Sequence, residues 1–187
     1  MRAAELLRDF VNTYDVEEDE ESLGTPEALA GWLGARGLGG DAGSGAGAEF
    51  ASGAAAECAV GPRELADAVA LREGLRRVMR CHHDRVECSD AGLEDVLSRL
   101  PVRVSLADGP RLVPATDGPG AGLAALAAAI AEARADGTWD RLKVCAESTC
   151  QWAFLDLSKN RSRSWCSMRV CGNRTKTRAY RARRAGG

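Results

Sequence analysis

Residues 145–171 read CAESTCQWAFLDLSKNRSRSWCSMRVC, and the spacing of their cysteines decides how this part of the chain folds. Two cysteine pairs, each with four residues between its members, are separated by fifteen residues. A structural zinc site takes four tetrahedral ligands and favours thiolates, which two short cysteine loops can supply together. We therefore predict a bound Zn2+, with an iron–sulfur cluster or a redox switch as the alternatives. The predicted ligands are Cys145, Cys150, Cys166 and Cys171.

The three other cysteines are spread through the preceding part of the chain. Cys81 is followed by His82 and His83, with Cys88 close behind, so a second metal cluster is one interpretation. Free cysteines are more commonly buried as small apolar side chains, and both histidines lie near an expected helix end. We therefore expect Cys58, Cys81 and Cys88 to have a structural role.

The net charge of −2 conceals a division of the chain into two parts. Residues 141–187 carry 12 Lys and Arg against 2 Asp and Glu, which gives +10. The first 140 residues carry the remaining 13 against 25, which gives −12. The basic part suits a polyanion, whereas the acidic part would be repelled by one.

The segment after the last cysteine, CGNRTKTRAYRARR, contains no helix breaker between Asn173 and Arg184. Small residues recur on one narrow helical face, which we expect to lie against the metal module: Gly172, Thr175, Ala179 and Ala182. The planar fork of arginine matches phosphate oxygens and base edges, so we predict contacts with nucleic acid. The predicted contacts are Arg161, Arg163, Arg174, Lys176, Arg178, Arg181, Arg183 and Arg184. A single helix favours double-stranded DNA over RNA, and a solvated helix paired with acidic protein is the alternative.

Apolar periodicity predicts a mainly α fold with a small β-hairpin (α+β). It comprises a helical N-terminal domain, residues 1–140, and a small C-terminal zinc finger with a basic helix, residues 141–187. The predicted helices start near residues 5, 25, 62, 92 and 121, and the hairpin pairs residues 102–106 with 111–114 around Asp108-Gly109. We expect a flexible Gly/Ala insertion at about 39–57 and a solvated acidic loop at Glu17 to Glu21.

Several classes of protein do not fit the sequence. The longest apolar run, Leu123 to Ala131, is far shorter than the ~20 residues that a membrane span requires. Charged residues interrupt what would be a secretory signal, so we expect a cytoplasmic protein with no membrane partner. No Ser/His/Asp order, phosphate loop or H-E-x-x-H pattern is present, and we expect no enzymatic activity.

Two sets of motifs resemble a known family. Residues 141–184, with WCSM (165–168) and CGNR (171–174) intact, resemble the CGNR zinc finger of actinobacterial and other bacterial proteins. Residues 6–13, LLRDFVNT, and residues 25–33, TPEALAGWL, resemble the ABATE domain that usually accompanies this finger. The sequence departs from the family pattern at Ser164, where an arginine often precedes WCSM.

The resemblance implies a stress-response transcription regulator that binds zinc and contacts DNA through its finger. Its N-terminal domain would sense a small-molecule effector or form a homodimer. The alternatives are a small-molecule-binding protein, or an RNA- or protein-binding adaptor with a structural zinc. In an adaptor, the acidic residues Glu17 to Glu21 could mask the basic helix until a signal arrives.

Overall fold

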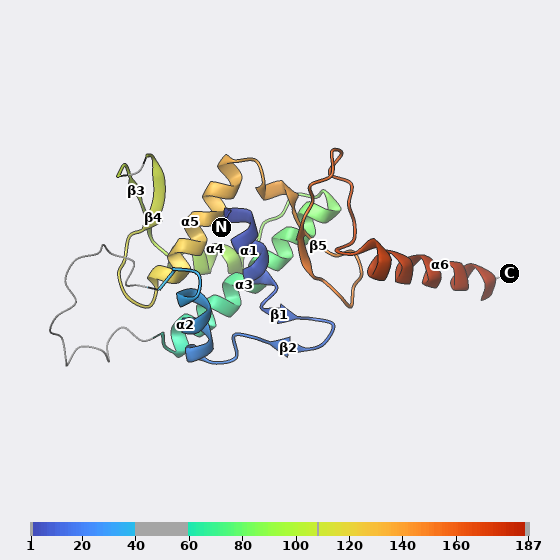
Figure 1. Ribbon diagram of the computed structural model, residues 1–187, viewed down its shortest axis with the longest axis horizontal. Coiled ribbons are helices and arrows are strands. Elements are labelled where there is room, and N and C mark those ends of the chain that lie inside the picture. Colours follow the sequence, from blue (N-terminus) through green and yellow to red (C-terminus); the bar gives the residue numbers. More distant parts are fainter. Residues whose placement is uncertain (1, 40–59, 108, 186–187) are drawn as a thin grey trace.

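The computed structural model describes residues 2–39, 60–107 and 109–185 (Figure 1). Its N-terminal part is built from five helices: α1 (Ala3–Val11), α2 (Pro26–Gly34), α3 (Pro62–Asp84), α4 (Ala91–Ser98) and α5 (Ala121–Ala135). Each predicted helix is present, which confirms the mainly α prediction. The predicted insertion falls almost entirely outside the described residues, as do Cys58 and Asp108.

The helix starts follow from local capping chemistry. The Thr25 hydroxyl accepts a hydrogen bond from the backbone N–H of Ala28 (3.2 Å), and Pro26 occupies the first turn of α2. Asp90 caps α4 by accepting from the N–H of Leu93 (2.8 Å). Such caps satisfy backbone donors that have no partner inside the helix. Within the described residues, no helix is both long enough and apolar enough to cross a membrane.

The core lies where α1, α3 and α5 meet. Leu7, Phe10, Leu71, Leu75 and Leu126 are fully buried there. Because the residues of α5 are mostly alanine, this helix approaches its neighbours closely. At Gly122, an added Cβ atom would lie 2.8 Å from both the Leu33 side chain and the Leu38 carbonyl oxygen.

Three antiparallel pairs of short strands accompany the helices. The predicted hairpin is confirmed as β3 (Val102–Ser105) and β4 (Arg111–Pro114), with Val102 opposite Pro114. A second pair, β1 (Tyr14–Asp15) and β2 (Glu20–Glu21), was not expected. Residues 17–21 are solvent-exposed as predicted, but Glu20 and Glu21 lie in a strand rather than in a loop.

Two buried arginines of α3 explain this strand pair. Arg72 contacts both carboxylate oxygens of Glu21 at 2.7 Å. Arg76 donates to the carbonyls of Val11 (2.7 Å) and Tyr14 (3.0 Å). A buried guanidinium needs such partners, because an unpaired charge is costly away from water. The arginines thus draw the acidic segment onto α3.

The C-terminal hairpin, β5 (Leu142–Val144) with β6 (Ala153–Leu155), packs on the same core. Leu142, Val144 and Ala153 are completely buried against the helices. The Asn12 side chain also pairs with the backbone of Ala153, donating to its carbonyl (2.9 Å) and accepting from its N–H (2.7 Å). The end of α1 is therefore joined to β6.

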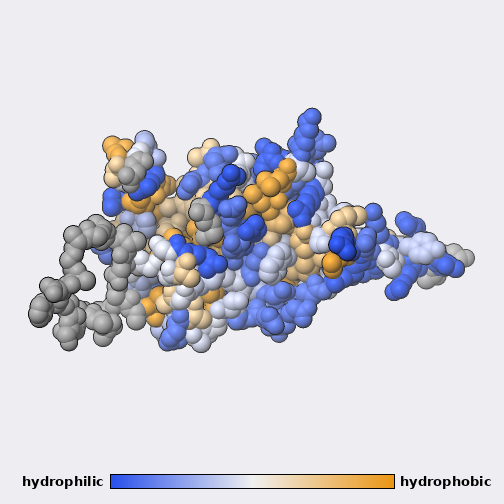
Figure 2. Space-filling view, in the orientation of Figure 1, coloured by the Kyte–Doolittle hydropathy of each residue, from blue (hydrophilic) through white to orange (hydrophobic). Residues whose placement is uncertain are grey.

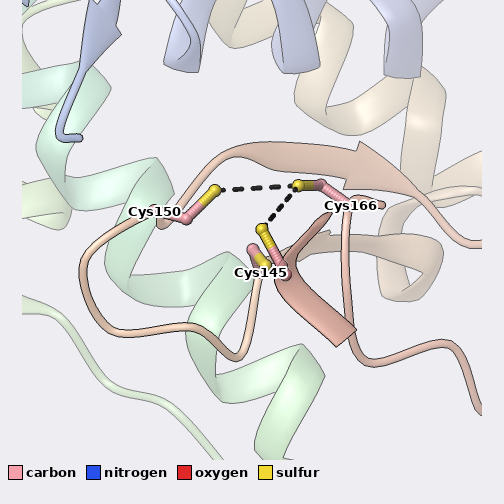
Figure 3. Close-up of side chains that lie close together, drawn as sticks. Cys145, Cys150 and Cys166 are labelled. Atoms are coloured by element: carbon pink, nitrogen blue, oxygen red, sulfur yellow. Dashed lines mark hydrogen bonds between the residues drawn. The ribbon is translucent and has the colours of Figure 1, made fainter. Parts of the chain in front are cut away.

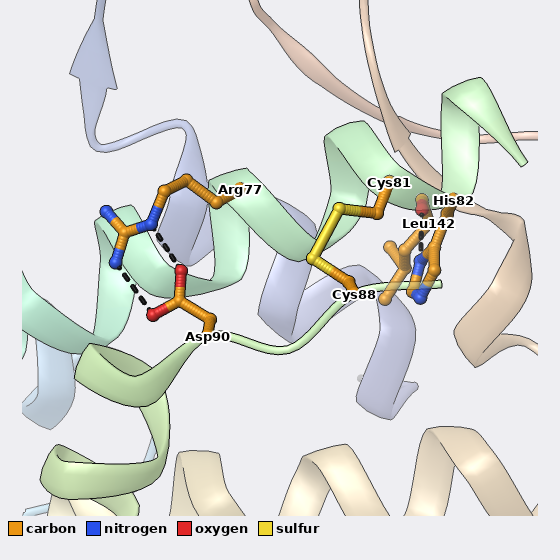
Figure 4. The surroundings of a disulfide bond; sticks show 6 residues. All are labelled: Arg77, Cys81, His82, Cys88, Asp90 and Leu142. Atoms are coloured by element: carbon orange, nitrogen blue, oxygen red, sulfur yellow. Dashed lines mark hydrogen bonds and ion pairs between the residues drawn. A yellow bond between two sulfur atoms is a disulfide. The ribbon is translucent and has the colours of Figure 1, made fainter. Parts of the chain in front are cut away.

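Cys81 and Cys88 form a disulfide beside the end of α3 (Figure 4). The two cysteines therefore have a structural role, as a disulfide rather than as free buried thiols. Arg85 adopts a left-handed conformation (φ 58°) that turns the chain back between them. His82 is oriented by the carbonyl of Leu142 (2.9 Å), and burial lowers its pKa. In the part of the chain that the structure describes, these residues form no second metal cluster.

Candidate metal centre and basic helix

The four predicted ligands lie together at the far end of the β5–β6 hairpin. Cys145 follows β5, and Cys150 lies shortly before β6, so one hairpin loop supplies both. Cys166 and Cys171 flank the turn that leads into α6 (Asn173–Ala185). Figure 3 shows Cys145, Cys150 and Cys166 pointing into one small space. All four sulfur atoms lie within 4.8 Å of one another.

The sulfur spacing fits one tetrahedral metal ion. The Sγ atoms of Cys150 and Cys166 are 3.6 Å apart, and those of Cys166 and Cys171 are 3.7 Å apart. A Zn–S bond of about 2.3 Å implies tetrahedral edges of about 3.8 Å. The thiols are free rather than joined in disulfides. The donor set and the spacing together make this a metal site.

The electrostatics of the site call for a cation. Burial raises the pKa of the Cys150 and Cys166 thiols, and raises that of Cys171 to about 12. Burial also opposes ionisation of Cys145, but backbone N–H groups at Cys166 and Glu147 outweigh it and lower the pKa. Several thiolates cannot coexist in so small a volume without a positive charge. A bound metal ion would supply that charge.

Backbone hydrogen bonds hold the first cysteine loop in shape. The N–H of Cys145 donates to the carbonyl of Trp152, and that of Cys150 donates to the carbonyl of Glu147. Gln151 has a left-handed conformation (φ 49°), and its carbonyl accepts from Arg76 of α3 at 3.1 Å. The helical body therefore helps to shape this loop.

Gly172 packs closely against Met168 at the start of the basic helix. It lies in the π-helical turn Met168–Gly172, with its N–H donating to the carbonyl of Ser167 (3.1 Å). An added Cβ atom would collide with the Met168 side chain. The small residue thus lets the WCSM methionine lie across the CGNR backbone.

Glu147, which the sequence analysis did not single out, anchors α6 to the metal site. Its carboxylate is buried and accepts hydrogen bonds from Thr175 and Arg178, each at 3.2 Å. Burial opposes its ionisation, but Arg178 outweighs that effect and the pKa is lowered. Charge sign alone could not have revealed this role, because most glutamates are solvated.

A buried ion pair shapes the loop between the cysteine pairs. Lys143 and Asp156 are almost completely buried, with Nζ and Oδ2 2.7 Å apart. Asp156 also accepts from the N–H of Arg163 (3.0 Å). Burial raises its pKa, but the hydrogen bonds of Lys143 and Ser158 lower it to about 2. The Arg161 carbonyl accepts from Lys143 at 2.6 Å, so both ends of the loop are fixed.

Comparison with known families agrees with this geometry. Residues 141–184 match the family model of the CGNR zinc finger. Residues 4–137, most of the chain, match the ABATE model, described as "Putative stress-induced transcription regulator". The chain belongs to the ABATE family. No curated protein matches the chain.

Three residues of the predicted nucleic-acid surface already have partners within the protein, one in the ABATE domain and the others in the finger. Arg174 of the CGNR motif pairs with Glu17 of the ABATE domain at 2.7 Å. Arg178 is held by Glu147. The Arg163 guanidinium donates to the carbonyls of Trp165 and Cys166.

The remaining cations of α6 are exposed, and no acidic partner is found for them among the described residues. They are Lys176, Arg181, Arg183 and Arg184. The expectation that small residues face the metal module is wrong beyond Thr175, because Ala179 and Ala182 are exposed. Figure 1 shows the reason: α6 extends away from the body, so its last turns lie beyond the residues around the metal site. In Figure 2 the extended helix is almost entirely hydrophilic.

Proposed function

We propose that this ABATE protein is a zinc-dependent transcription regulator that binds double-stranded DNA through α6, and that it is not an enzyme. The projecting basic helix carries the proposal. It is fixed at its first turn to the metal site, while the cations of its outer turns are free for a partner. A protein that reads DNA in this way would work in the bacterial cytoplasm.

The four cysteines would hold Zn2+, which in a structural site supplies folding energy rather than chemistry. Cys145 and Cys150 tie the ion to the hairpin, which is part of the main core. Cys171 immediately precedes the CGNR glycine and the first turn of α6. The ion would therefore set the direction in which α6 leaves the body.

The dimensions and charge of α6 suit the major groove of DNA. At 1.5 Å per residue, its 13 residues span about 20 Å, and the major groove admits a helix of this kind. Arg181 and Arg183 can contact phosphates or guanine edges without breaking an ion pair. Binding should weaken steeply with salt, because phosphate contacts release counterions.

The ABATE domain would regulate the finger by sensing a small molecule or by forming a homodimer. It contacts the finger through Asn12, Arg76 and Glu17. A change at any of these contacts would alter how the first turn of α6 is held. The family description names a transcription regulator, which is consistent with control of the finger by this domain.

The test is DNA selection with the purified full-length protein loaded with zinc, followed by titration of a selected duplex. We expect the double variant Arg181→Gln, Arg183→Gln to lose at least about tenfold in affinity and to reduce the salt slope by about 2. The matched control is Arg63→Gln, Arg103→Gln, which removes two exposed charges from the body and should change affinity less than about twofold.

Failure to select any duplex, or equal losses in the two double variants, would overturn DNA binding by α6. Tighter binding to single-stranded RNA of matched length than to duplex DNA would favour the adaptor function instead. Zinc content and far-UV circular dichroism of each variant show whether the fold is retained.

A further inference from the structure

A groove of about 690 Å³ lies between the ABATE domain and the finger. Helices α1 and α2 form one wall, and β6 with the loop after it forms the other. This volume is in the range of small-molecule sites, which favour boundaries between domains. We call it the tryptophan groove and define it by Trp32, Trp152, Phe154, Arg8, Arg36 and Arg163.

The base of the groove is rigid. Asn12 lines it and is committed to its two hydrogen bonds with Ala153. Trp32 is held against Phe10, with ring centroids 5.4 Å apart. A site whose walls are fixed before binding loses little entropy when a ligand arrives.

The groove offers flat aromatic surface. Trp152 is 36% exposed, although large aromatic side chains are usually covered in a core. Trp32 and Phe154 each lie beneath an arginine, with Arg36 3.9 Å from the Trp32 centroid and Arg163 4.8 Å from the Phe154 centroid. Trp152 carries no such cation among the described residues, so its ring is the surface on which a planar ligand can stack.

The cations of the groove exceed its carboxylates. Arg8 is neutralised by Asp9 at 2.7 Å, and Glu5 accepts from the backbone N–H of Arg2. Arg36 and Arg163 have no carboxylate partner in the described part of the chain and bond only to backbone carbonyls. Three arginines and two carboxylates line the groove.

Arg36 has an unmet hydrogen bond. Its Nε atom is buried and has no partner, whereas Nη1 donates to the Trp32 carbonyl at 3.2 Å. Leaving a buried donor without a partner lowers the stability of the fold. A carboxylate is well matched to a guanidinium, because both are planar and two parallel hydrogen bonds can form.

We propose that the tryptophan groove binds a small planar aromatic carboxylate, with its ring on Trp152 and its carboxylate at Arg36. Arg163 connects this site to the metal centre, because it stacks on Phe154 and bonds to the carbonyl of the ligand residue Cys166. A ligand bound in the groove would therefore change the contacts that Arg163 makes with the finger. Only this regulatory consequence rests on the proposed function; the binding site itself does not.

The experiment titrates the full-length, zinc-loaded protein, without DNA, with benzoate, 1-naphthoate and indole-3-acetate by calorimetry. Benzamide lacks the charge, and cyclohexanecarboxylate lacks the flat ring. We expect at least one aromatic acid to bind about tenfold more tightly than these analogues. Arg36→Met should lose about tenfold in affinity for that acid, whereas Arg103→Met, at an exposed arginine of β3, should be unchanged.

Binding of none of the three acids at about 10 mM, which corresponds to a Kd weaker than the mM range, would overturn the site. Equal binding by Arg36→Met would also overturn it, and the zinc content of that variant shows whether it is folded. A protein that binds an aromatic acid but no DNA would retain this site while the proposed function fails. The reverse result would remove the site alone.

Discussion

The Arg174 guanidinium lies 2.7 Å from the Glu17 carboxylate, which joins the CGNR motif to the acidic segment of the ABATE domain. Both side chains are about one-third exposed. Ion pairs of this exposure contribute little to stability, so the contact can open without unfolding either part. A DNA phosphate would compete for Arg174 with the carboxylate that now holds it.

Removing this carboxylate should increase DNA affinity. We expect Glu17→Gln to bind DNA up to about fivefold more tightly, because the ion pair no longer opposes the release of Arg174. The matched control is Glu20→Gln, since Glu20 is exposed in β2 and has no side-chain partner among the described residues. Anisotropy titrations that show the same affinity for both variants would exclude masking by Glu17. Deletion of residues 17–21 is a poorer test, because it also removes the Glu21 anchor of Arg72.

Removal of the metal should disorder the finger and leave the helical body folded. We expect one Zn2+ per chain by elemental analysis, and loss of amide protection in residues 145–150 and 166–176 after chelation. Amide protection in α3 should persist, because its core contacts do not involve the four cysteines of the metal site. Hydrogen exchange with mass spectrometry measures both regions at once. Unchanged protection around the cysteines in metal-free protein would contradict a structural ion.

Close packing of α5 against α2 predicts that two glycine-to-alanine variants change the free energy of unfolding in opposite directions. Gly122→Ala should destabilise the fold by about 1–2 kcal/mol, because the new methyl group meets the Leu38 carbonyl, which cannot easily move. Gly31→Ala in α2 has no atom within 4 Å of the new Cβ, so higher helix propensity should stabilise the fold by up to about 1 kcal/mol. Urea unfolding measures both. Equal effects would show that the two helices are not in contact at Gly122.

Acid should weaken the start of α4. The hydrogen bond of Arg77 lowers the pKa of Asp90 to about 2 (Figure 4), below the usual value of about 4. Because the folded pKa is the lower one, this stabilisation is complete above pH 4 and is lost as the pH falls toward 2. Asp90→Asn keeps a capping side chain but should remove about 1 kcal/mol at pH 7 and progressively less as the pH falls through 2. A pH-independent difference in unfolding free energy between this variant and the unchanged protein would exclude a role for the Asp90 charge.

Local chemistry explains what could be predicted from the sequence. The cysteine spacing and the cap at Thr25 are patterns within a few residues, so the metal centre and the helices follow from them. Long-range pairs could not be predicted in this way. Arg72 meets Glu21 across 51 positions, and Asn12 meets Ala153 across 141. Nothing in the neighbourhood of these residues distinguishes them from solvated polar side chains.

One prediction failed and one disulfide was not foreseen, because the geometry that decides each is absent from the local sequence pattern. Cys88 reaches Cys81 only because Arg85 turns left-handed without a glycine, which the residue types around it did not signal. The small face of α6 was expected to be covered, but burial depends on how far the module extends beside the helix. Ala179 lies beyond its edge.

The hairpin that carries the first two cysteines contributes Leu142 and Val144 to the main hydrophobic core. A peptide beginning at residue 141 would therefore present these side chains to water and should aggregate even with zinc present. The finger therefore needs the body in order to fold, although the body does not need the metal site. A fusion protein that borrows α6 would therefore also need the helices on which the β5–β6 hairpin packs.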